Sequence, residues 1–397
     1  MNGKWVATLC AISIVVSILG VLILTESAWA QPAKKGVLEI GMTGPLSGAG
    51  IIYGYASLAA LQLTMDEINQ AGGLKVGATV YTLKAIPYDT KYLPEPAVTA
   101  AKRLVYEDKV KIIFGEIGSA AGLAMQAITE PNKVIFLPDT YTERMLSPDK
   151  PYTFRMGITP VEFAPSMLAY YRQRFPQAKR IGYLFREDET GRSMLRLQQK
   201  HAPETRFEIV PFPVEPGTMD LTPLVTKILA GNIDILDANG NPPGEVTQIV
   251  NIAKGMGWTK PIVRTGGPIV DELIRLCGKN ANGFIYREDS DLSQPKVATL
   301  VNRFKAKGYP ATPCTNMPPF YDAAHILFKA IEKAGTIDDT TKIKEAMESI
   351  ESYDGIQGKV RWGGKEAYGI AHQLLNPSFI GEIIDGKPTI LQRVDIK

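Results

Sequence analysis

Short apolar segments alternate with helical segments along most of the chain, and this alternation defines the fold class. In the first half, apolar runs at 80–86, 110–114 and 134–137 are interleaved with stretches of helical spacing at 95–106 and 119–129. Short apolar strands that alternate with helices of about 10 to 15 residues are typical of a parallel sheet covered on both faces. The sequence therefore predicts an α/β fold.

The same alternation restarts after a break near residue 155. Further strands are predicted at 181–185, 207–212, 233–236 and 261–263, with helices between them. Later come helices near 321–333 and 341–350, short strands over 355–362, and a hairpin around Asp385-Gly386. A second complete series predicts a second doubly wound lobe. We find no low-complexity linker, so we expect several crossing strands to join the lobes rather than a flexible tether.

The N-terminus has the features of a secretory signal peptide over residues 1–30. Lys4 precedes an apolar run from Trp5 to Leu24, and Ala28-Trp29-Ala30 fits the small-residue cleavage pattern. The alternative is a retained membrane anchor, because the run is about 20 residues long. We expect cleavage before Gln31 and export to the periplasm. The roughly 365 remaining residues suit two lobes of ordinary size.

Charge and cysteine content limit the partners. The chain carries 44 basic and 41 acidic residues without a dense basic stretch, so we expect no nucleic-acid partner. After cleavage only Cys277 and Cys314 would remain. An oxidising compartment would permit a disulfide between them, but they could equally be two buried thiols.

Motifs for catalysis, metals and nucleotides are missing from the sequence. His201, His325 and His372 are not at metal spacing, and Ser119 stands one place too early for a G-x-S-x-G elbow. In the glycine-rich loop 41–50, a dinucleotide fingerprint read from Gly48 would need glycine where Tyr53 stands. We therefore expect no enzyme, no catalytic residue, no cofactor and no metal.

Two loops that leave a strand and open a helix are candidate ligand contacts. In the first, backbone N–H groups at 118–120 and the Ser119 hydroxyl could bind a carboxylate, although Ser119 could instead cap its helix. In the second, Glu245 lies in a first helical turn, where it could meet an ammonium group or simply be solvated. Together the two loops would suit a zwitterion such as an α-amino acid.

Several further motifs occur in a recognisable order. They are Gly44-Pro45-Leu46-Ser47-Gly48 with Tyr53-Gly54, Asp66-Glu67-Ile68-Asn69 with Ala71-Gly72-Gly73, Tyr88-Asp89, Phe114-Gly115 with Ser119, Leu137-Pro138, and Glu245-Val246-Thr247-Gln248-Ile249-Val250 with Ala253 and Gly257. In order and spacing they resemble the periplasmic solute-binding proteins of ABC importers for branched-chain amino acids, the leucine-binding type.

This resemblance implies a type I periplasmic binding fold: two Rossmann-like lobes joined by a three-crossover hinge, with the ligand in the cleft between them. It implies lobe 1 at 36–157 and 287–358, and lobe 2 at 158–286 and 359–397. It also implies hinge closure on the ligand, delivery to an inner-membrane ABC permease, and a monomeric protein.

The resemblance also implies roles for individual residues. Ser119 corresponds to the carboxylate-binding serine of the family, and Glu245 to its ammonium-binding glutamate. The remaining implied contacts are the loop residues Asp139, Thr140 and Tyr141, the aromatic wall residue Tyr53, and Tyr286, which like Tyr321 is placed near the hinge.

Two residues depart from the family pattern. Thr190 stands where an aromatic residue is common, and Asp139 stands where small residues are common. Asp139 could receive a second cationic or hydroxyl group of the ligand, or it could pair with Arg144. The main hypothesis is therefore an amino-acid-binding protein. The alternatives are a binding protein for an aromatic acid, amide or urea-like solute, a sensory ligand-binding module and, least favoured, an enzyme.

Overall fold

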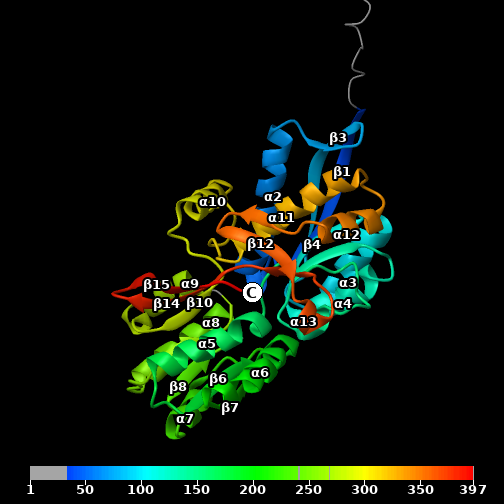
Figure 1. The fold of residues 1–397 in the computed structure, drawn as a ribbon. Coiled ribbons are helices and arrows are strands. Elements are labelled where there is room, and N and C mark those ends of the chain that lie inside the picture. Colours follow the sequence, from blue (N-terminus) through cyan, green and yellow to red (C-terminus); the bar gives the residue numbers. More distant parts are fainter. Residues whose placement is uncertain (1–33, 240–241, 268, 397) are drawn as a thin grey trace, which may run out of the picture.

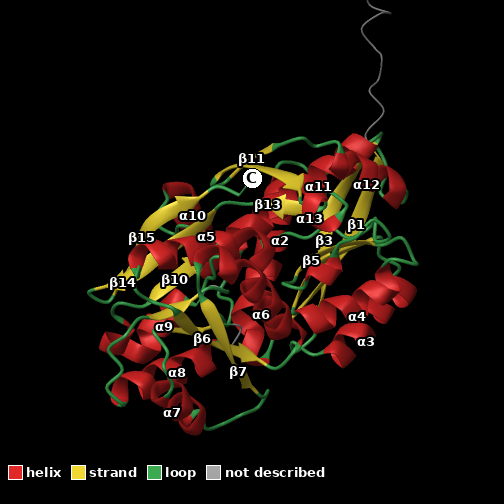
Figure 2. Ribbon diagram, turned by 60° about the horizontal axis from the view of Figure 1, so that its bottom comes forward, coloured by secondary structure: helices red, strands yellow, loops and turns green. Residues whose placement is uncertain are grey.

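The computed structural model describes residues 34–239, 242–267 and 269–396, which form two α/β lobes stacked one above the other (Figure 1). Helices cover both sides of the strands in each lobe (Figure 2). The predicted fold class is confirmed. The predicted signal peptide at residues 1–30 lies outside the described residues.

The first lobe is built on a five-stranded sheet. Its strands are β1 (Lys34–Gly44), β2 (Leu74–Val76), β3 (Thr79–Asp89), β4 (Ile112–Ile117) and β5 (Ile135–Asp139), in the order β2-β3-β1-β4-β5. All neighbours are parallel except β2, which pairs antiparallel with β3 at the edge. Every residue of β4 is buried, as expected for a strand covered on both faces.

Helices pack on both faces of this sheet. One face carries α2 (Ile51–Gln70), α10 (Pro295–Ala306), α11 (Met317–Ala334) and α12 (Thr340–Glu348). The other carries α3 (Pro94–Lys102), which continues as a π-helical turn over Arg103–Glu107, and α4 (Ser119–Thr129). The C-terminal helices therefore complete a core that the N-terminal strands began.

The second lobe is built on a seven-stranded sheet. Its strands are β6 (Arg180–Arg186), β7 (Glu208–Val214), β8 (Ile235–Ala238), β9 (Ile262–Arg264), β10 (Ile285–Glu288), β14 (Ser378–Ile384) and β15 (Lys387–Val394), in the order β15-β14-β10-β9-β8-β6-β7. The five consecutive strands β6 to β10 are parallel, whereas β14 and β15 are antiparallel additions at one edge. The predicted hairpin is confirmed, because Asp385 and Gly386 join β14 to β15 with φ angles of 50° and 71°.

The second sheet is also covered on both faces. α5 (Pro160–Arg174) and α6 (Glu189–His201) lie on one side, and α7 (Thr222–Ala230), α8 (Pro243–Gly255) and α9 (Val270–Cys277) lie on the other. α5 begins immediately after the first passage between the lobes. Its start is fixed by a capping box, in which the Thr159 hydroxyl accepts from the Val161 amide and Glu162 accepts from the Thr159 amide.

The chain passes between the lobes three times. Met156 packs in the first core, and Ile158 lies in a cluster with residues of the second lobe. The second passage follows β10, and the third follows a small antiparallel sheet of β11 (Tyr353–Gly355), β12 (Gly358–Gly363) and β13 (Gln373–Leu375), interrupted by α13 (Lys365–Tyr368). Trp362 and Leu374 pack in the first core. We therefore propose that the first lobe extends to about residue 375, before the chain returns to the second sheet.

Cys277 and Cys314 are both buried free thiols, one in the core of each lobe. The sequence allowed either a disulfide between these residues or two buried thiols, and the structure has the two thiols. Within the described ranges, no helix combines the length and the apolar character needed to cross a bilayer.

Candidate ligand-binding site

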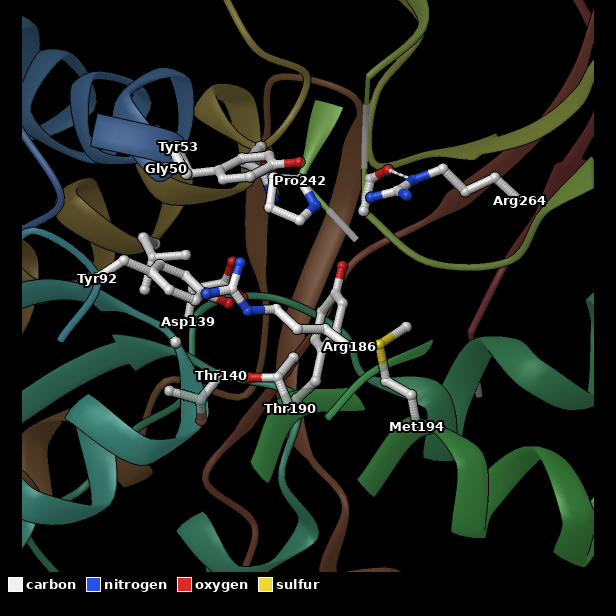
Figure 3. A pocket seen from close by; sticks show the side chains of 16 residues that line it. Gly50, Tyr53, Tyr92, Asp139, Thr140, Arg186, Thr190, Met194, Pro242 and Arg264 are labelled. Atoms are coloured by element: carbon white, nitrogen blue, oxygen red, sulfur yellow. Dashed lines mark hydrogen bonds between the residues drawn. The ribbon is translucent and has the colours of Figure 1, made fainter. Parts of the chain in front are cut away.

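A small pocket lies between the lobes (Figure 3). The first lobe contributes Ala49, Gly50, Tyr53, Tyr92, Ile117, Gly118, Asp139, Thr140, Tyr141 and Asn316, and the second contributes Arg186, Thr190, Met194, Pro242, Arg264 and Gly267. The cavity has a volume of about 70 Å³. Most of its lining follows the carboxyl ends of parallel strands, which is where ligands bind in open α/β sheets.

Five of the predicted site residues line this pocket. They are Tyr53, Asp139, Thr140, Tyr141 and Thr190. Ser119 and Glu245 stand next to lining residues without being part of the lining. Tyr286 packs in the core of the second lobe, with 1% of its surface exposed. The structure therefore brings the two candidate loops to one cleft but leaves Tyr286 outside it.

Ser119 is fully buried at the junction of β4 and α4. Gly118, with a φ of 111°, makes the turn and is the N-cap residue of α4, so the side chain of Ser119 does not cap the helix. The Ser119 amide donates to Oγ1 of Thr190 over 3.1 Å, which joins the two lobes. The Ser119 hydroxyl accepts from the amide of Thr142 over 3.2 Å. The Ser119 amide, one of the predicted carboxylate donors, is thus bonded to the second lobe, whereas the Ser119 hydroxyl acts here as an acceptor.

Glu245 lies in the first turn of α8, as predicted, but its side chain is only 16% exposed. An oxygen of Glu245 lies 3.7 Å from Nη1 of Arg186, whose Nε lies 3.0 Å from Asp188. Burial raises the pKa of Glu245, and the charge of Arg186 opposes that shift. Glu245 therefore lies beside the same guanidinium as Asp188 and is half-buried rather than fully solvated, and its Oε2 has no hydrogen-bond partner among the described residues.

Asp139 ends β5 and is 5% exposed. Burial, followed by the negative charge of Asp289, raises the pKa of Asp139 to about 7, although Arg155 and Arg287 act in the opposite direction. Among the described residues, its Oδ1 has no hydrogen-bond partner and its carboxylate has no ion pair. The suggested pair with Arg144 is wrong, because Arg144 instead lies 3.6 Å from Glu189.

Arg264 ends β9 and reaches the pocket from the second lobe (Figure 3). It is 3% exposed. Its Nε donates to the carbonyl of Gly267 over 2.7 Å, and its Nη1 donates to the carbonyl of Ala238 over 2.9 Å. No described carboxylate forms an ion pair with it. The pocket therefore contains a buried cation whose acceptors, among the described residues, are both neutral carbonyls.

Two tyrosine hydroxyls from the first lobe face the same place. A β-carbon built on Gly267 would lie 3.5 Å from Nη2 of Arg264, 3.5 Å from the hydroxyl of Tyr53 and 3.7 Å from that of Tyr141. The Tyr141 hydroxyl also accepts from Nη2 of Arg287 over 3.2 Å. Burial raises the pKa of both tyrosines, so both are neutral hydrogen-bond donors at physiological pH.

Contacts across the mouth of the cleft hold the lobes together. The Thr142 hydroxyl donates to Glu189 over 2.9 Å, and Arg196 lies 3.1 Å from Glu143. With the Ser119–Thr190 bond, these contacts describe a closed arrangement.

Sequence reasoning did not identify several lining residues, among them Tyr92, Arg186, Met194, Arg264 and Gly267. Arg186 and Arg264 each directly follow a predicted strand of the second lobe, so the rule for strand ends could have found them. Across the described ranges, no group of three or more His, Cys, Asp or Glu side chains is placed to hold a metal ion.

Comparisons with known proteins agree with this geometry. A family model described as periplasmic binding protein matches residues 37–387. The chain is 25% identical over 314 residues to a leucine-, isoleucine-, valine-, threonine- and alanine-binding protein of Pseudomonas aeruginosa, covering 78% of this chain and 82% of that protein. It is 24% identical over 349 residues to the Leu/Ile/Val-binding protein BraC3 of Rhizobium johnstonii, and the match covers 86% of this chain and 91% of that protein.

Solved structures share the fold. The leucine-binding protein LivK of Thermotoga maritima superposes with a TM-score of 0.78 at 20% identity, covering 90% of this chain and 99% of that one. A solute-binding protein of R. palustris, solved in complex with benzoate, superposes with a TM-score of 0.76 at 16% identity. The match covers 91% of this chain and 97% of that one.

Proposed function

The chain belongs to the periplasmic binding protein family, and we propose on this basis that it captures a small carboxylate-bearing solute between its lobes and delivers it to an ABC permease. An amino acid is the first candidate. The family consists of binding proteins rather than enzymes, in agreement with the sequence prediction.

The observation that carries the proposal is a pair of opposite charges in one small pocket. Asp139 and Arg264 both line it, and neither has an ion pair among the described residues. A buried charge without a partner is costly, because the protein replaces the lost hydration poorly. A zwitterion offers one group to each, so an α-amino acid would remove both costs at once.

The size of the pocket supports a small solute. One buried water needs roughly 10 to 15 Å³ of such space, so a cavity of about 70 Å³ holds roughly five to seven water-sized groups. An amino acid is of this order, whereas a peptide or a long acyl chain is larger. The names of the curated relatives, which describe binding of leucine, isoleucine and valine, favour the same class.

An aromatic acid is the second candidate. Tyr53, Tyr92 and Tyr141 line the pocket together with Ile117 and Met194, which gives it mostly apolar walls. Flat rings pack well between such side chains. The benzoate complex of a protein with the same fold favours this class as well.

Family membership supports a proposal for the location and the partners of the protein. A periplasmic site of action, a cleaved signal peptide over residues 1–30 and an inner-membrane permease as partner are part of the proposal, as is a monomeric state. The match to the family model from residue 37 onward leaves residues 1–30 outside the binding domain, which is consistent with a removable leader.

Thermal unfolding of the mature protein, stripped of co-purified ligand, tests the proposal. The panel contains amino acids, their amides, and aromatic acids and amides. A ligand at about 100 times its Kd stabilises by roughly 2.7 kcal/mol, which raises the Tm by several degrees. A shift with amino acids supports the first candidate, and a shift with benzoate alone supports the second. No shift with any carboxylate would contradict both.

A further inference from the structure

Three potential hydrogen-bond donors surround one point beside Gly267. They are Nη2 of Arg264 from the second lobe and the hydroxyls of Tyr53 and Tyr141 from the first, each within 3.7 Å of the position that a β-carbon on Gly267 would take. Because Gly267 has no side chain, one atom the size of a β-carbon would fit at this point, at ordinary contact distance from all three groups, and Gly267 lines the pocket. Donors converging from different elements are the usual form of an oxyanion site.

The charge at this point is positive. The two bonds made by Arg264 go to backbone carbonyls, which orient the guanidinium without neutralising it. Arg186, the other arginine of the lining, differs because Asp188 and Glu245 both lie close to it. Of the two cations that line the pocket, Arg264 is therefore the one that forms no ion pair with a described carboxylate, although its charge acts against the burial-raised pKa of Asp237 and of Glu245.

Of the donors predicted from the sequence, the Ser119 amide is already used. The Ser119 amide bonds to Thr190, and the Ser119 hydroxyl accepts from Thr142. A ligand carboxylate at Ser119 would have to displace the contact between the lobes. A carboxylate beside Gly267 would leave the bond between Ser119 and Thr190 in place.

We propose that the carboxylate of the solute binds beside Gly267, between Arg264 of the second lobe and the hydroxyls of Tyr53 and Tyr141 of the first, with the other end of the solute toward Asp139. This inference rests on the proposed function and deepens it. The orientation is the reverse of the one that Ser119 and Glu245 would impose. The anion itself then links the lobes, because its donors come from both sides of the cleft.

Calorimetric titration with matched pairs of solutes tests the orientation. The pairs are L-leucine with L-leucinamide and benzoate with benzamide, each of which changes the carboxylate into a neutral amide. We expect the wild-type protein to bind the acid of at least one pair about 10- to 100-fold more tightly than its amide, because bonds to charged groups are the strong ones. In Arg264→Gln the acid and amide affinities should differ by less than about threefold.

Further variants distinguish carboxylate binding at Arg264 from carboxylate binding at Ser119. Ser119→Ala should keep the wild-type ratio of acid to amide affinity, and Arg264→Lys should restore part of it. Gly267→Val leaves every charge in place and fills the proposed anion position, so it should weaken acid binding at least about tenfold. This variant is informative even if Arg264→Gln fails to fold, which its Tm and circular dichroism would show.

Two results would overturn the inference. In the first, folded Arg264→Gln keeps the wild-type ratio of acid affinity to amide affinity. If Arg264→Gln does not fold, the equivalent result is an unchanged acid affinity in Gly267→Val. The other is a ratio that collapses in Ser119→Ala. Failure of the wild-type protein to bind any member of either pair is a different result, because it would contradict the proposed function for these classes together with the inference built on it.

Discussion

Thr190 Oγ1 accepts a hydrogen bond from the backbone amide of Ser119 over 3.1 Å, and the two residues belong to different lobes. Both are buried, so water cannot easily replace this bond. The bond links the start of α4 to the start of α6 at the floor of the pocket. It is one of three contacts that hold the closed arrangement, with the Thr142–Glu189 hydrogen bond and the Arg196–Glu143 ion pair.

Replacement of Thr190 by valine should favour the open form of the ligand-free protein. The change leaves the Ser119 amide without its acceptor, which should cost the closed form roughly 1 to 3 kcal/mol. Pulsed electron–electron double resonance between spin labels on the two lobes would show a larger share of long distances in Thr190→Val than in the wild type. Thr190→Ser, which keeps the hydroxyl, is the matched control and should resemble the wild type. Equal distance distributions in all three proteins would contradict the role of this bond.

The stability of the ligand-free protein should fall as pH rises, in part because of Asp139. Its folded pKa of about 7 is higher than the value near 3.9 of an unfolded aspartate, so the folded state binds the proton more tightly. Its contribution is fully present below about pH 4 and is lost between about pH 4 and 7, by up to roughly 4 kcal/mol. Denaturant unfolding at several pH values should give a flatter profile for Asp139→Asn. Parallel profiles for the two proteins would contradict the shifted pKa.

Binding of a cationic ligand group should depend on pH in the opposite direction. An ammonium group pairs with the ionised form of Asp139, so its affinity should rise through about pH 7 by up to tenfold per unit below that value. Calorimetry with L-leucine between pH 5.5 and 8 would measure the slope, with Asp139→Asn as the control that removes it. An affinity for L-leucine that is independent of pH in the wild type would place its ammonium group elsewhere.

Glu245→Gln should weaken an amino-acid ligand by less than about 1 kcal/mol. Glu245 lies beside Arg186, and Asp188 remains near that arginine when Glu245 is neutral. Direct contact between Glu245 and the ligand ammonium would instead cost about 1.5 to 3 kcal/mol. Side-by-side titrations of Glu245→Gln and Asp139→Asn decide between the two acids, since the larger loss marks the one that meets the ligand.

Gly157→Ala should destabilise the protein by about 1 to 3 kcal/mol, because a β-carbon there would overlap Oδ1 of Asp139. In the background of Asp139→Ala the obstructing oxygen is gone, so the two changes should be less than additive in the free energy of unfolding. Gly244→Ala is a suitable control, since nothing lies within 4 Å of its added carbon. Full additivity would contradict the close approach.

The strands and helices followed from local patterns because their causes are local. The predicted helix at 119–129 has the same bounds in the structure, and the hairpin at Asp385-Gly386 forms where turn residues demand it. The helix α10 (Pro295–Ala306) was not predicted, although Val297, Leu300 and Phe304 are its buried stripe. Its helical spacing was therefore present in the sequence and was overlooked.

The site was harder to predict because its contacts are not local. Ser119 and Thr190 are 71 positions apart in the sequence, and no periodicity links them. The sequence showed that Ser119 and Glu245 open helices at the ends of strands, but it could not show that Arg186 would approach Glu245 or that Thr190 would accept from Ser119. The contacts between the two lobes determine which polar groups in the cleft stay unpaired, and these contacts are not encoded in any local sequence pattern.

The threading of the chain through both lobes also sets an order of events during synthesis. The first core needs α11 and α12, which are made after the whole parallel part of the second sheet, and that sheet needs β14 and β15 from the very end of the chain. Neither half can therefore complete its core on the ribosome while most of the polypeptide is still being added. Contacts of such long sequence separation form slowly. Both lobes therefore reach their final packing only after the last strand of the chain has been made.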